Sequence, residues 1–83
     1  QNELNDVEKI SKKFLTLKNK IKYTKNINQF LKKTKKNFER FFNIKIEYLE
    51  NRNTNDLSIS NEYHGSKIFL AYYYKSVRLI DNF

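Results

Sequence analysis

The spacing of apolar residues changes near the middle of the chain, and this change constrains the fold more than any other feature. Before Asn43, apolar residues recur every three or four positions, as on one face of an α-helix. After it, Ile44, Ile46 and Tyr48 alternate with charged residues, as on one face of a β-strand. This order of patterns predicts an α+β domain in which basic amphipathic helices come first and pack on an antiparallel sheet.

Two helices are predicted in the first half. Apolar spacings of three and four predict a helix over residues 7–21, with Asn5 as its N-cap. A second helix is predicted over residues 27–42, with Asn26 as its N-cap. Asn43 should end it, because asparagine tolerates the left-handed conformation of a C-cap. One long helix remains an alternative, since neither glycine nor proline separates the two segments.

The second half predicts a β-meander of three to four strands. The expected strands are residues 44–49, 57–62, 67–75 and a short fourth strand within 76–83, which is favoured over a helix. Residues 50–56 contain three Asn and one Asp and predict a turn, as does Gly65. We expect Phe30, Phe38, Phe41 and Phe42 to cover one side of this sheet.

Charge is distributed unevenly along the chain. With 83 residues, the chain is expected to form one domain, consisting of a basic helical part (1–43) and a neutral β part (44–83). The first part carries 12 basic and 4 acidic side chains, whereas the second carries 5 of each. Such asymmetry is typical of a surface for an anionic partner.

The lysines of the helical part lead to the main functional hypothesis. Lysines that meet phosphates release counterions, which favours RNA or another polyanion as the partner. The hypothesis is a non-enzymatic structural module that binds nucleic acid through phosphate contacts, most simply a small RNA-associated or ribosomal-type protein. The candidate contacts are Lys12, Lys13, Lys20, Lys32, Lys33, Lys35 and Lys36.

Catalytic residue patterns are missing from the sequence. There is no cysteine for a thiolate metal site, and a single glycine cannot build a phosphate-binding loop. His64, the one histidine, is expected to be an exposed turn residue. We therefore predict no catalytic residues, no metal, no cofactor and no enzymatic activity.

Amino-acid usage and hydropathy bear on localisation. Lys, Asn, Ile, Phe and Tyr, all with A/T-rich codons, dominate the sequence, which indicates an A/T-rich genome. The expected location is intracellular, in the cytoplasm or in an organelle with such a genome. No apolar run reaches the roughly 18 residues of a membrane span, and a membrane partner is not expected.

An alternative hypothesis starts from the first helix. Its apolar residues form a heptad-like stripe that suits a partner helix. The segment Phe38 to Tyr48, followed by Leu57 to Tyr63, resembles the order of elements in the RWD-like C-terminal domain of the Mad1 family of spindle-checkpoint proteins. The resemblance implies a protein-interaction module that self-associates or docks on an acidic partner. The stripe consists of Val7, Ile10, Phe14, Leu17 and Ile21.

Overall fold

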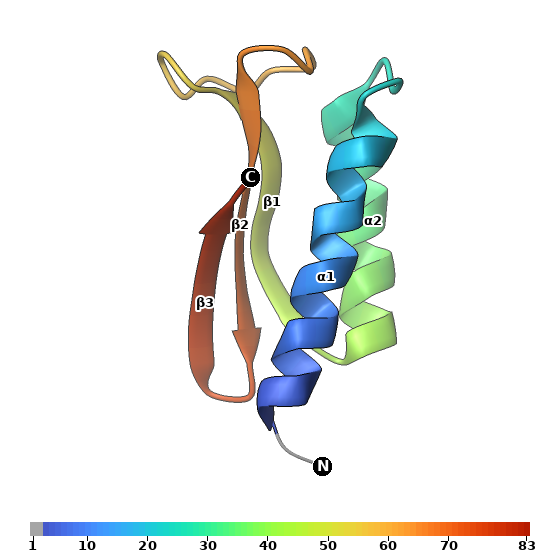
Figure 1. Cartoon of the computed structure of the whole chain (residues 1–83), viewed down its shortest axis with the longest axis vertical. Coiled ribbons are helices and arrows are strands. Elements are labelled where there is room, and N and C mark those ends of the chain that lie inside the picture. The colour runs from blue at the N-terminus through green and yellow to red at the C-terminus, as the bar shows by residue number, and fades with distance from the viewer. Residues whose placement is uncertain (1–2) are drawn as a thin grey trace.

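Two helices followed by a three-stranded sheet make up the fold. A computed structural model of the chain describes residues 3–83. The elements are α1 (Glu3–Ile21), α2 (Ile27–Phe42), β1 (Lys45–Asn53), β2 (Ser66–Tyr74) and β3 (Val77–Asn82). The strands are antiparallel in the order β1-β2-β3. Figure 1 shows both helices on the same face of this sheet, which confirms the predicted α+β class.

The helix ends differ in part from the prediction. Helix α1 begins at Glu3, so Asn5 lies inside the helix and is not its N-cap. Good helix formers before Asn5 allow the helix to start earlier. Asn26 is the N-cap of α2, but its side chain makes no capping hydrogen bond to any described residue. Asn43 ends α2 in the left-handed conformation, with φ 55° and ψ 49°, as predicted.

The second predicted strand is wrong. Residues 57–62 form no strand; they contact the end of β1 through an isolated bridge between Ile59 and Arg52 and through backbone hydrogen bonds of Ser58 and Ser60. Strand β1 instead continues to Asn53, through part of the segment predicted as a turn, and its last residue pairs with Ser66 of β2. The chain between these two strands is therefore a long connection. The strands predicted over 67–75 and within 76–83 are confirmed as β2 and β3.

A register shift interrupts the alternation expected along β1. The pairing with β2 shifts between Ile46 and Tyr48, which is the mark of a β-bulge. Ile46 and Leu49 are consequently the buried residues of this stretch, at 2% and 5% exposure, and Tyr48 is out of phase with them.

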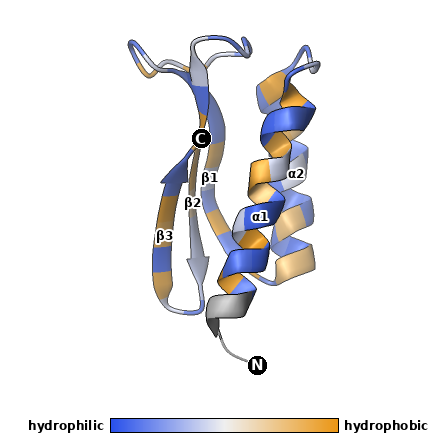
Figure 2. Cartoon of the chain, viewed as in Figure 1, coloured by the Kyte–Doolittle hydropathy of each residue, from blue (hydrophilic) through white to orange (hydrophobic). Residues whose placement is uncertain are grey.

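The core lies between the helices and the sheet. Ile10, Phe14, Leu17 and Ile21 are each at most 2% exposed, so most of the α1 stripe belongs to the domain's own core and is not free to bind a partner helix. Val7, at the N-terminal end of the stripe, is half-buried. Figure 2 shows the apolar and polar bands that alternate along both helices.

The aromatic side chains of α2 contribute less to the core than predicted. Ile27 and Leu31 are fully buried, whereas Phe30, Phe38 and Phe42 are only partly buried against the core. Phe41 is 77% exposed, so its predicted place over the sheet is wrong. It follows Phe38 by three positions at the end of the helix, where the neighbouring Phe42 takes the inner position.

Candidate functional site

The predicted lysine contacts are spread over both helices. Lys12, Lys13 and Lys20 are exposed on α1, and Lys32, Lys33 and Lys36 are exposed on α2, with Lys35 half-buried. Lys13 borders an apolar hollow beside Phe38 and Phe41. Lys32 and Lys35 lie together at a pocket between α2 and β1, which also contains polar side chains of the opposite charge.

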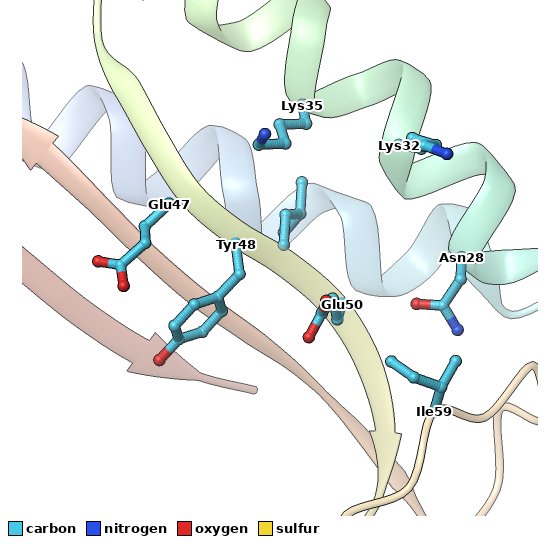
Figure 3. Close-up of a pocket in the computed structure, with 8 residues that line it drawn as sticks. Asn28, Lys32, Lys35, Glu47, Tyr48, Glu50 and Ile59 are labelled. Carbon is cyan, nitrogen blue, oxygen red and sulfur yellow. The ribbon is translucent and has the colours of Figure 1, made fainter.

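This pocket has a volume of about 270 Å³. Figure 3 shows Asn28, Lys32 and Lys35 extending from α2, Glu47, Tyr48 and Glu50 from β1, and Ile59 lying across from Asn28. Leu49 completes the lining. On α2, the contributing residues are four and three positions apart, so the helix presents them on a single face.

Side chains of α2 also reach the backbone of β1. Asn28 Oδ1 accepts a hydrogen bond from the N–H of Asn51 at 2.7 Å, and its Nδ2 donates to the Asn51 carbonyl at 3.2 Å. Three turns further along α2, Glu39 Oε2 accepts from the N–H of Ile46 at 2.8 Å. These bonds hold the outer edge of β1 against the helix at both ends of the pocket.

Asn51 ties the long connection to the same place. Its buried amide donates to the carbonyls of Ser60 at 3.0 Å and Glu62 at 3.1 Å, and to Ser66 Oγ at 3.0 Å. Asn28 Nδ2 also donates to the Ser60 carbonyl at 2.7 Å. Neither asparagine stands out in the sequence, because Asn28 lies within a predicted helix and Asn51 within a predicted turn.

The charges lining the pocket are unequally neutralised. Glu47 pairs with Arg78 at 2.7 Å, and Glu50 pairs with Arg52 at 2.8 Å. Across residues 3–83, no acidic side chain forms an ion pair with Lys32 or Lys35. The ammonium groups of Lys32 and Lys35 thus have no carboxylate partner within residues 3–83, whereas Glu47 and Glu50 each pair with an arginine. Figure 3 shows the two lysine side chains pointing in different directions.

The ionisation of Glu47 follows from its contact with Arg78. The hydrogen bond from Arg78 holds the pKa of the Glu47 carboxyl below its ordinary value. Glu47 is therefore ionised at neutral pH and is a poor proton acceptor. As an ionised carboxylate it binds and orients a cationic group, which in this structure is the guanidinium of Arg78.

His64 is exposed in the turn before β2, with its ring against Tyr63. In the described part of the chain, no group of three His, Asp or Glu side chains is placed to hold a metal ion. Neither helix between Glu3 and Phe83 is long and apolar enough to cross a membrane.

Comparison with known proteins gives one family. The family model of pantoate-β-alanine ligase matches residues 1–83. Neither the curated proteins nor the solved structures include a match to this chain.

The family match overturns the functional predictions made from the sequence. A non-enzymatic nucleic-acid-binding or ribosomal module is wrong, as are the interaction-module alternative and the predicted lack of enzymatic function, because the matched family is one of enzymes. The excess of lysine does not distinguish these functions, because a basic surface attracts small anionic substrates as well as polyanions. The chain belongs to the pantoate-β-alanine ligase family.

Proposed function

We propose that this domain takes part in joining pantoate to β-alanine and that it binds β-alanine in the pocket between α2 and β1. The family match supports the reaction. The observation that carries the assignment of the pocket is the pair of ammonium groups, Lys32 and Lys35, that lack an acidic partner in the described chain.

The chemistry of the two substrates favours β-alanine for this pocket. Amide formation consumes the carboxylate of pantoate, whereas the carboxylate of β-alanine passes through the reaction unchanged. A carboxylate that is only held can remain bound to lysines throughout, through charge-assisted hydrogen bonds. β-Alanine also carries an ammonium group, which the pocket accommodates on its β1 side, where Glu47 and Glu50 are each paired with an arginine.

The role proposed for the pocket is binding and orientation. Lys32 and Lys35 attract the carboxylate, and the amino end lies toward β1. Because the pKa of Glu47 is lowered, chiefly by the hydrogen bond from Arg78, this side chain is not the base that takes the proton of the ammonium before the amine attacks. Holding the amine in one orientation lowers the entropic cost of the bond-forming step.

The test is a titration of ¹⁵N-labelled chain with β-alanine, followed by NMR. Amide signals of Lys32, Lys35 and Glu50 should shift together. The variant Lys32→Ala/Lys35→Ala should bind about tenfold more weakly, which corresponds to roughly 1.4 kcal/mol. Lys12→Ala/Lys20→Ala removes the same charge from α1 and should leave the affinity unchanged.

Two outcomes would contradict the proposal. Equal weakening in both double variants would mean that β-alanine responds only to overall charge. Shifts produced by pantoate and not by β-alanine would show that the pocket holds the other substrate.

A further inference from the structure

The exposed ring of Phe41 stands between two hollows of the helix layer. Helix α2 ends beside the N-terminal half of α1 (Figure 1). Phe41 borders the hollow of about 600 Å³ that Lys13 also borders. It also borders a hollow of about 260 Å³ together with Ile10 and Phe42. The other lining residues of the two hollows are different, so a ligand in either one would contact this ring.

A chain of aromatic contacts holds the ring in its outward position. The centroid of Phe41 lies 4.9 Å from that of Phe42, at an interplanar angle of 81°. Phe42 lies 5.5 Å from Phe38, which lies 5.0 Å from the buried Phe14. One side of Phe41 is therefore packed against the core aromatics, although the residue is 77% exposed to water. An apolar ligand that covers the ring removes this surface from water, which favours binding.

The larger hollow has positive charge at its rim and no acid. Lys13 lines it from α1, and Arg40 and Asn37 line it from one side of α2, three positions apart. Among residues 6–83, no acidic side chain forms an ion pair with Lys13 or Arg40. A guanidinium matches the two oxygens of a carboxylate, and an asparagine amide can donate one more hydrogen bond. The hollow therefore favours a carboxylate beside an apolar group.

The smaller hollow fixes the orientation of such a ligand. Lys9 and Asp6 both line it, and Asp6 Oδ2 accepts a hydrogen bond from the Tyr74 hydroxyl at 2.6 Å. A negative charge is already present there, so the carboxylate of a ligand belongs in the larger hollow. An apolar group that starts in the larger hollow and also reaches Phe42 must extend along Phe41, which favours a flexible chain over a compact group.

We propose that the two hollows bind an alkyl carboxylate of medium chain length, with its carboxylate at Lys13 and Arg40 and its chain along Phe41. The site lies on the helix layer, away from the pocket between α2 and β1, and its occupant is not a substrate of the ligation. Pantoate carries hydroxyl groups, which lose their hydration against aromatic rings without gaining partners. The proposal does not rest on the function proposed for the other pocket.

The experiment titrates the ¹⁵N-labelled 83-residue chain with octanoate and follows the amide signals by NMR. Signals of Lys13, Arg40 and Phe41 should shift, and those of Lys32 and Lys35 should stay in place. 1-Octanol keeps the chain and lacks the charge, so it should bind about tenfold more weakly. Butyrate keeps the charge and lacks four methylenes, so it should also bind at least about tenfold more weakly. Pantoate should bind more weakly than octanoate.

Two variants test the assigned contacts. Phe41→Ala and Arg40→Gln should each weaken octanoate binding roughly five- to tenfold, since one removes apolar contact and the other a charge-assisted hydrogen bond. Both residues are exposed, and unchanged far-ultraviolet circular dichroism will verify that the variants fold. Leu15→Ala and Lys20→Gln remove an exposed apolar side chain and a charge elsewhere on α1, and should leave octanoate binding unchanged.

Several results would overturn the proposal. Equal binding of 1-octanol or butyrate would remove the need for charge or for the chain, and tighter binding of pantoate would assign the hollow to a substrate. Equal losses in the control variants would mean that octanoate binds the helices without a site. A lower sedimentation coefficient of ligand-free Phe41→Ala would show that a second copy covers the ring. In each case, β-alanine shifts at Lys32 and Lys35 would leave the function proposed for that pocket standing.

Discussion

The two helices cover the same face of the sheet but attach to it differently. Helix α1 contributes four apolar side chains that are almost completely buried, with polar contacts such as that of Lys18 to the Phe83 carbonyl, at 3.2 Å, beside them. Helix α2 has fewer fully buried apolar side chains, and its Asn28 and Glu39 bond directly to the backbone of β1. The first attachment provides stability, and the second determines how the edge of β1 is presented.

The largest loss of stability is expected when the apolar attachment of α1 to the sheet is weakened. Phe14 is 1% exposed, and its ring lies 5.0 Å from Phe38 and 5.4 Å from Tyr72 between centroids. Phe14→Ala should lower the free energy of unfolding by about 3–5 kcal/mol, which approaches the total stability of so small a domain. Urea unfolding measures this, with Leu15→Ala as the control because Leu15 is 52% exposed. Similar losses in both variants would show that the α1 core is not the main source of stability.

A smaller loss of stability is expected when the polar attachment of α2 to β1 is removed. Asn28→Ala leaves the N–H of Asn51 without its acceptor and removes one of the two side-chain donors to the carbonyl of Ser60, at a cost of roughly 1–3 kcal/mol. Asn28→Asp keeps the acceptor and loses the donor, so it should be intermediate. Hydrogen exchange at the Asn51 amide should accelerate most in Asn28→Ala and remain unchanged in Gln29→Ala. Unchanged exchange in Asn28→Ala would mean that α2 does not protect this edge.

The smallest effect is expected when the exposed ion pair between Glu47 of β1 and Arg78 of β3 is removed. The pKa of Glu47 is lowered, chiefly by its hydrogen bond from Arg78. The ion pair therefore stabilises the folded state fully above pH 4.5, the ordinary pKa of this carboxyl, and the stabilisation disappears as the pH falls through the lower pKa of the folded state. Arg78→Ala should raise the pKa of Glu47 toward 4.5, as read from its carboxyl ¹³C shift. Arg52→Ala serves as the control. If both variants give the same pKa, Arg78 is not the cause of the shift.

Local sequence patterns predicted most of the secondary structure. The apolar stripe of α1 and the continuous apolar run of β2 extend over many residues, so both elements were clear. The strand predicted over 57–62 failed because strand pairing depends on distant partners, and β2 pairs with the end of β1 instead. The alternation predicted from Ile46 to Tyr48 failed for a similar reason. The bulge there leaves one residue unpaired, which is visible only in the register of the two strands.

The candidate site was predictable only in its charge. Lys32 and Lys35 were among the predicted contacts because charge can be read from the sequence, and their expected anionic partner stays a prediction. The contacts of Asn28 depend on how α2 packs on β1, and the outward direction of the Asn51 backbone depends on strand register. Neither property belongs to a residue type, so no sequence pattern indicated them.

The main-chain groups that α2 contacts on β1 have an evolutionary consequence. Lysine and asparagine dominate this chain, in line with codon drift toward A and T, and such drift replaces side chains. A main-chain N–H and C=O are supplied by every residue other than proline. Substitutions at Ile46 or Asn51 that preserve the fold therefore leave the N–H that Glu39 or Asn28 contacts in place, so mutational pressure on composition cannot erase this half of the attachment one codon at a time.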